Sequence, residues 1–73
     1  MREVEKNEAN YVLIVSNPYT KKILYKIYFD LEGNEGVGNM LRYVTEQYPG
    51  MIDMNSRIDF ARVIAGDTLW REL

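Results

Sequence analysis

The side chains that most often carry out catalysis are missing from this sequence, which has 73 residues and neither cysteine nor histidine. Without them there is no imidazole base and no thiolate nucleophile. The usual ligands of a structural zinc site are absent for the same reason. Ser16 and Ser56 have no base at a suggestive spacing. We therefore expect a protein that is not an enzyme, holds no metal and uses no cofactor.

Residues 30–38 contain the only other grouping that could bind a small ion. Asp30, Glu32 and Glu35 supply oxygen ligands, which hard cations prefer, but their spacing does not match an EF-hand. The glycines of the same segment follow the spacing G-x-x-G-x-G, which is neither the dinucleotide fingerprint nor a P-loop. The neighbouring carboxylates would also repel a phosphate. We interpret the segment as a solvated loop.

Tyrosines and lysines alternate through residues 19–28. This pattern is typical of sheets that stack nucleic-acid bases on tyrosine and hold phosphates with lysine. It is equally typical of an edge strand whose lysines discourage aggregation. The chain carries 9 basic and 11 acidic residues, a net charge of −2, so it lacks the basic field of most nucleic-acid binders. A single-stranded nucleic acid is therefore the alternative partner, and a protein is the expected one.

Two strands and one helix account for the first two thirds of the chain. Residues 11–15 form a dense apolar run, and residues 23–29 a second strand. Asn17 and Pro18 indicate a turn between them, which predicts an antiparallel hairpin. A helix is expected over residues 35–48, with Asn34 as its N-cap and Pro49 at its end. Its apolar face would carry Val37, Met40, Leu41, Val44 and Tyr48, with Leu41 and Val44 as the main anchors.

The last third fits two structures. Residues 57–65 suit a strand, followed by a turn at Gly66 and Asp67 and a short strand over residues 68–71. A helix from Ser56 to Gly66 is the competing interpretation, because both ends resemble caps. With strands, the fold is α+β: a small antiparallel or mixed sheet of about three or four strands, with one amphipathic helix packed on one face. The order is β-β-α-β or β-β-α-β-β, and the strand over residues 11–15 is central.

The predicted hairpin register assigns side chains to two faces of the sheet. A four-residue turn over residues 17–20 would place Leu13 opposite Leu24 and Tyr11 opposite Lys26. The face under the helix would then hold Val12, Ile14, Ile23, Tyr25, Ile27 and Phe29. The other face would keep an apolar, tyrosine-bearing patch, and such patches usually mark interaction sites. The residues that we expect to contact a partner are Tyr11, Leu13, Leu24, Lys26, Tyr28, Tyr43 and Trp70.

These features predict a small, non-catalytic protein-binding module, an inhibitor or adaptor, formed by residues 10–73 behind a polar arm of residues 1–9. Two alternatives concern the second sheet face: the termini fold over it, or it forms a homodimer. The richness in Asn, Ile and Tyr is compatible with an AT-rich genome and a phage or mobile-element protein. No apolar run approaches the length of a membrane span, and residues 1–10 are unlike a signal peptide. We expect a cytoplasmic protein with no membrane partner.

Overall fold

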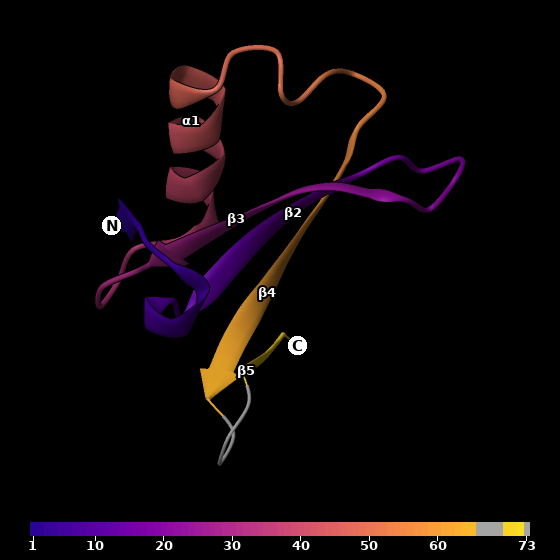
Figure 1. Ribbon diagram of the computed structural model, residues 1–73. Coiled ribbons are helices and arrows are strands. Elements are labelled where there is room, and N and C mark those ends of the chain that lie inside the picture. The colour runs from indigo at the N-terminus through magenta and orange to yellow at the C-terminus, as the bar shows by residue number, and fades with distance from the viewer. Residues whose placement is uncertain (66–69, 73) are drawn as a thin grey trace.

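A computed structural model of the chain describes residues 1–65 and 70–72. Within them, one helix packs on a five-stranded antiparallel sheet, so the predicted α+β class is confirmed. The elements are β1 (Arg2–Glu3), a 3-10 turn η1 (Lys6–Glu8), β2 (Tyr11–Ser16), β3 (Ile23–Asp30), α1 (Val37–Gln47), β4 (Arg57–Ala65) and β5 (Trp70–Glu72). Figure 1 shows them in space.

Strand β2 lies at the centre of the sheet, as predicted. The strand order is β1-β3-β2-β4-β5, and β2 pairs antiparallel with both β3 and β4. Val12, Leu13 and Val15 are completely buried because other elements cover both faces of this strand. An unbroken apolar run is what such a position requires.

Helix α1 covers one face of the sheet and is anchored by Met40 and Val44, both completely buried. Val44 was expected in this role, but Leu41 was not correctly assigned, because 36% of its surface is exposed. The core beneath the helix consists of Leu13, Val15, Ile27, Phe29, Leu31, Met40 and Val44. The helical stripe is therefore turned away from Val37 and Leu41 and toward Met40, Val44 and Tyr43.

The start of α1 also differs from the prediction. The N-cap residue is Gly36, not Asn34, and no side chain caps the helix. Glu35 instead folds back, and its Oε1 accepts a hydrogen bond from the N–H of Glu32 at 3.0 Å. The loop before the helix is thus closed by a carboxylate that bonds to the loop backbone.

The β2–β3 register is shifted by three residues from the predicted one, because Leu13 lies opposite Ile27 and not opposite Leu24. A shift by an odd number of residues moves one strand's side chains to the other face. Tyr11, Leu13 and Val15 of β2 therefore lie on the helix side, together with Ile27 and Phe29 of β3. The predicted core face was wrong for β2. On β3 it was right for Ile27 and Phe29 but wrong for Ile23, which pairs with Ser16 beyond a bulge and lies on the side away from α1.

The shift originates in the hairpin loop, because the last paired residues, Ser16 and Ile23, enclose the six residues 17–22 where four were predicted. Inside this loop Asn17 N–H donates to the carbonyl of Lys22 at 2.9 Å. Lys21 has φ of 64°, a conformation that is uncommon in residues other than glycine. A lysine in the sequence therefore gives no reason to expect it. A bulge between Val15 and Ser16 adds one further residue on β3.

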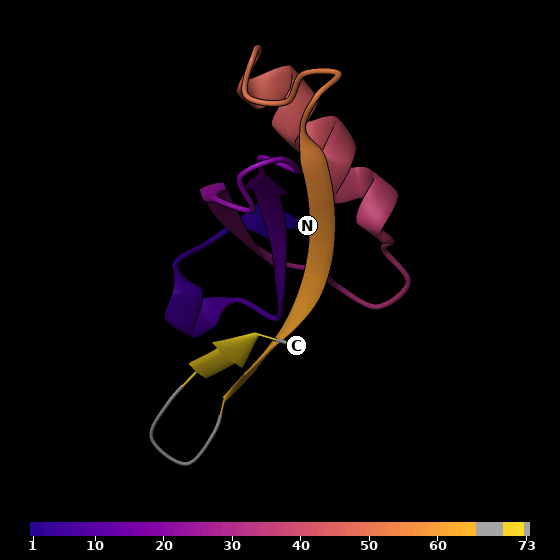
Figure 2. The ribbon, with the colours of Figure 1, turned by 90° about the vertical axis from the view of Figure 1, so that its right-hand side faces the viewer.

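The face opposite α1 is partly covered by the two ends of the chain, and Figure 2 shows η1 and β5 on the side of the sheet away from the helix. Ala9, Val12 and Val63 form a small buried cluster there, with Val4, Ile14, Tyr28 and Ala61 packed around it. Coverage by the termini was the alternative considered for this face. It applies to the end of the sheet near Val12 and Tyr28.

Strand β4 confirms the extended interpretation of residues 57–65, because it spans Arg57–Ala65 and pairs with β2 along Arg57–Arg62. Ser56 belongs to a tight turn and not to a helix cap: its N–H donates to the carbonyl of Asp53 at 3.1 Å. The final strand is Trp70–Glu72, not residues 68–71. The predicted turn at Gly66 and Asp67 lies outside the described residues.

Candidate protein-binding surface

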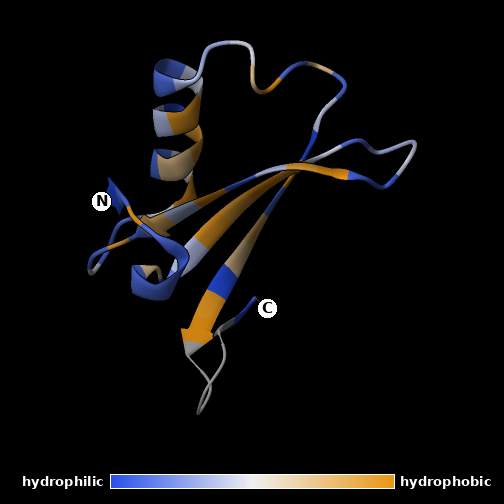
Figure 3. Cartoon of the chain, in the orientation of Figure 1, coloured by the Kyte–Doolittle hydropathy of each residue, from blue (hydrophilic) through white to orange (hydrophobic). Residues whose placement is uncertain are grey.

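Among the described residues, the loop end of the β2–β3 hairpin carries the densest group of exposed apolar side chains. Tyr19 is 84% exposed, Ile23 52%, Leu24 50% and Tyr25 46%. We call these four residues the hairpin-end surface. Figure 1 shows that this end of the hairpin extends away from α1, and in Figure 3 a hydrophobic segment at the start of β3 follows a hydrophilic loop.

The hairpin loop is held in a defined shape by Asn17. Its side-chain Oδ1 accepts hydrogen bonds from the N–H groups of Tyr19 at 2.9 Å and Thr20 at 3.2 Å. Its carbonyl accepts a third bond, from the N–H of Lys21 at 2.8 Å. Asparagine at the start of a turn commonly bonds to the backbone ahead of it in this way. The hairpin-end surface is therefore presented by an ordered turn.

The outer edge of β3 is open beside this surface. Strand β1 pairs with β3 only at Phe29 and Asp30, and Val4 N–H donates to the carbonyl of Tyr28 at 3.0 Å. In the part of the chain that the structure describes, nothing pairs with this edge from Ile23 to Ile27. The bulge at Leu24 and the lysine at position 26 are features that limit unspecific edge pairing. Binding here would therefore depend mainly on side chains.

A hollow of about 400 Å³ lies beside the hairpin-end surface, on the sheet face away from α1. Its floor and walls come from three strands and the hairpin loop. The lining residues are Ile14, Ser16, Asn17, Lys21, Ile23, Arg57, Asp59, Phe60 and Ala61. Lys21 and Ile23 thus connect the hollow to the hairpin end, while Tyr25, opposite Val15, lies on the helix side of the sheet.

Basic side chains surround the hollow and the hairpin end. Lys21 and Lys22 are exposed, and no carboxylate of the described residues lies within ion-pair distance of either. Arg57 contributes a guanidinium, whose Nε lies 3.0 Å from Oδ2 of Asp59. This end of the molecule can therefore attract a negatively charged group.

The predicted partner residues are distributed over several parts of the fold. Leu24 and Lys26 lie on the exposed part of β3. Tyr11 and Leu13 lie on the helix side, where Leu13 has no exposed surface, so their assignment to the second face was wrong. Trp70, the first residue of β5, pairs through its backbone with Ala65 of β4. The side chain of Trp70 lies outside the described structure.

Tyr28 is on the predicted face but is held against the C-terminal strand. Its hydroxyl donates to Oε1 of Glu72 at 2.7 Å, and Nζ of Lys26 lies 2.9 Å from Oε2 of the same carboxylate. Burial and the neighbouring Glu72 raise the pKa of Tyr28 to about 12. Tyr28 and Lys26 therefore hold β5 in place through Glu72, and we call this contact the latch.

Tyr43 was expected to be exposed or peripheral, but it packs against the core. Its ring meets that of Phe29 edge to face, with centroids 5.4 Å apart. The hydroxyls of Tyr43 and Tyr48 both donate to Oε1 of Glu3, at 3.1 and 2.6 Å. The bond to Glu3, with burial, raises the pKa of Tyr48 to about 12. Tyr43 thus ties α1 to β1 and lies apart from the hairpin-end surface.

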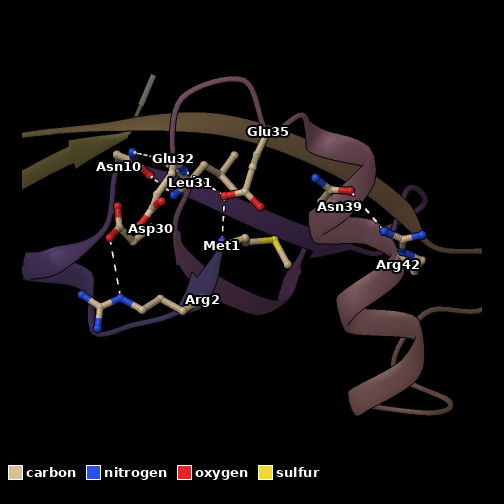
Figure 4. A network of polar contacts seen from close by, with 9 residues as sticks. All are labelled: Met1, Arg2, Asn10, Asp30, Leu31, Glu32, Glu35, Asn39 and Arg42. Atoms are coloured by element: carbon tan, nitrogen blue, oxygen red, sulfur yellow. Dashed lines mark hydrogen bonds and ion pairs between the residues drawn. The ribbon is translucent and has the colours of Figure 1, made fainter.

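Two carboxylates of the acidic loop are held in ion pairs. Figure 4 shows its carboxylates in ion pairs: Asp30 with Arg2 at 3.6 Å and Glu35 with the amine of Met1 at 2.7 Å. Among residues 1–65 and 70–72, no group of three His, Cys, Asp or Glu could hold a metal ion. Glu35 is drawn into this network, and its pKa is lowered by its bonds to the terminal amine and the Glu32 backbone.

Sequence reasoning missed Tyr19, Ile23 and Tyr25 as surface residues. Ile23 and Tyr25 were assigned to the core face, and alternation places Tyr25 opposite the buried Val15 on that face. Tyr25 is nevertheless exposed because the hairpin runs past the end of the helix. The available signal was the length of the second strand. Residues 23–30 are too many for the helix predicted over residues 35–48, even with its connecting loops, to cover completely.

Comparison of the chain with models of protein families, with curated proteins and with solved structures found no significant match. The single described helix is too short and too polar to cross a membrane. Function is therefore inferred from the surface itself.

Proposed function

We propose that this chain is a small, non-catalytic protein-binding module, an inhibitor or adaptor, and that the hairpin-end surface is its contact surface. The observation that carries the proposal is the group Tyr19, Ile23, Leu24 and Tyr25, large apolar side chains that are about half exposed or more within seven residues. Exposed apolar side chains gathered at one end of a molecule usually mark an interaction site.

The chemistry of the group supports a protein partner. Tyrosine provides a large contact area at a small cost in side-chain entropy, and it is enriched at binding hot spots. Ile23 and Leu24 add aliphatic surface that gains free energy when it leaves water. The hairpin holds these side chains on an ordered turn, so less entropy is lost on binding.

The experiment is a quantitative pull-down from a native cell lysate with the wild-type chain and matched variants as bait. Leu24→Ser and Tyr25→Ser remove surface from the hairpin end, and Met54→Ser removes a still more exposed apolar side chain elsewhere. Loss of a hot-spot side chain should weaken binding about thirtyfold. If folded Leu24→Ser and Tyr25→Ser proteins still retained the partner, the hairpin end would not be the contact surface.

A single-stranded nucleic acid is the second candidate, because Tyr19 and Tyr25 are exposed beside Lys21 and Lys22. Such a surface can stack bases and contact phosphates. Binding of that kind weakens steeply as salt rises, since counterions are released from the phosphates. Titration of oligothymidylate at low and physiological ionic strength distinguishes this function from protein binding.

A further inference from the structure

The identity of the partner segment can be narrowed by charge, an inference that rests on the proposed function. We propose that the hairpin-end surface and the adjoining hollow bind an acidic segment of a partner protein, in which carboxylates flank an apolar side chain. Lys21 and Lys22 would pair with the carboxylates, and the hollow would receive the apolar side chain.

The first argument is the state of the lysines on this hairpin. Lys26 is already neutralised by Glu72, with Nζ and Oε2 2.9 Å apart. Lys21 and Lys22 are exposed, and the ion pairs of the described residues include neither. Two positive charges beside an apolar surface are complementary to a segment that is both acidic and apolar.

The second argument is the separation of charge along the molecule. The carboxylates of Glu3, Asp30, Glu32 and Glu35 lie around β1, the distal end of β3 and the loop that follows it. The loop end of the hairpin, with Lys21 and Lys22, lies at the other end of β3 (Figure 1). Asp30 is paired with Arg2 and Glu35 with the amine of Met1, so Glu3 and Glu32 are the two of these four without an ion pair among the described residues. A negatively charged partner is therefore drawn preferentially to the hairpin end.

The third argument is the composition of the hollow. Ile14, Ile23, Phe60 and Ala61 give it an apolar lining, and Lys21 places a cationic group at the same site. Arg57 also lines the hollow, where it is paired with Asp59. An aliphatic or aromatic side chain can leave water there while a neighbouring carboxylate stays near a cation. A volume of about 400 Å³ is large enough for such a side chain.

A second copy of this chain fits the surface poorly. In a two-fold symmetric dimer the same patch lies on both sides of the interface, so Lys21 and Lys22 of one copy would face those of the other. Apposed like charges oppose association. A nucleic acid would satisfy the lysines but not the apolar hollow, and the chain's net charge of −2 opposes a polyanion.

The test begins with selection of short random peptides displayed on phage against the immobilised full chain. The expected result is enrichment of peptides that combine Asp or Glu with an aliphatic or aromatic residue. The affinity of one enriched peptide is then measured by fluorescence anisotropy with the wild type, Leu24→Ser, the double variant Lys21→Glu with Lys22→Glu, and Arg42→Glu as a charge-reversal control on α1 that changes the net charge by half as much.

The double lysine variant should weaken binding at least about tenfold, and Arg42→Glu should leave it nearly unchanged. Two results would overturn this inference and leave the proposed function intact. One is peptides whose binding depends on Leu24 but which are not acidic, and the other is peptides whose affinity is unchanged by the double lysine variant. Enrichment of no peptide that depends on Leu24, together with an unaffected pull-down for Leu24→Ser, would overturn both. Displacement of the peptide by oligothymidylate that binds more tightly would overturn the protein-segment assignment.

Discussion

The side chain of Asn10 closes two hydrogen bonds with the backbone of Leu31. Its Nδ2 donates to the Leu31 carbonyl and its Oδ1 accepts from the Leu31 N–H, both at 2.8 Å (Figure 4). The amide thus continues the β2–β3 pairing beyond its last strand residues. It fixes the chain as it leaves β3 and places the buried Leu31 beneath α1.

Replacement of Asn10 by alanine should therefore destabilise the fold. The change leaves a part-buried donor and acceptor of Leu31 without partners, which typically costs about 1–3 kcal/mol. For a domain of this size, each kcal/mol lowers the melting temperature by roughly 4–8 °C. Thermal denaturation followed by circular dichroism measures the effect, with Asn34→Ala in the exposed loop as control. Equal melting temperatures for the two variants would show that the pair of hydrogen bonds between Asn10 and Leu31 contributes nothing to stability.

The helix should depend on Met40 much more than on Leu41. Met40 is completely buried, whereas Leu41 is 36% exposed. Met40→Ala should cost about 2–5 kcal/mol, because it removes buried methylenes and leaves a cavity. Leu41→Ala should cost clearly less. Urea denaturation of both variants gives the two free energies of unfolding, and a larger loss for Leu41→Ala would contradict the observed orientation of α1.

The latch between Glu72 and Tyr28 predicts a dependence of stability on pH. Burial disfavours the charge of Glu72, but Lys26 and Tyr28 outweigh it, so its pKa lies below the ordinary value of 4.5. The unfolded chain then takes up the proton at a higher pH than the folded chain. The stabilisation is complete above pH 4.5 and is lost as pH falls through the lower folded pKa.

Glu72→Gln should accordingly lower the melting temperature at neutral pH, by an amount equivalent to about 1 kcal/mol or less. The difference from wild type should shrink as pH falls below 4.5. Glu46→Gln on the exposed side of α1 is the matched control. A difference between Glu72→Gln and wild type that stays constant from neutral to acidic pH would contradict the latch.

Replacement of Lys21 by glycine should affect stability and binding in opposite ways. Its φ of 64° is costly for a residue with a Cβ and free for glycine. Lys21→Gly should leave the melting temperature unchanged or raise it, while it weakens the affinity for an acidic peptide. Lys22→Gly, at a position without a positive φ, serves as comparison. A lower melting temperature for Lys21→Gly than for Lys22→Gly would contradict this view of the turn.

The elements of this fold could be predicted from local sequence patterns. The apolar run at residues 11–15 is dense enough to specify a central strand, and the spacing of Met40 and Val44 specifies a helix. Each signal depends on neighbours within a few residues along the chain. The sequence therefore indicated the α+β class, the central position of β2 and the extended state of residues 57–65.

The register could not be predicted, because it depends on the conformation of Lys21 and on the bulge next to Ser16. Neither has a sequence signature, and an odd shift exchanges the faces of β2. The candidate site moved with it: Leu13 became core, while Ile23 and Tyr25 became surface. Leu24 remained exposed under both assignments, and it is the extra residue of the bulge on β3.

The most direct measurement of the central claim is site-specific photo-crosslinking in a native cell lysate, with a diazirine side chain at position 24 and, separately, at positions 41 and 54. All three native side chains are apolar and exposed, so the probes differ mainly in location. We predict a crosslinked partner protein from position 24 and far lower yields from positions 41 and 54. A partner captured mainly from position 41 or 54, with none from position 24, would contradict the assignment of binding to the hairpin end.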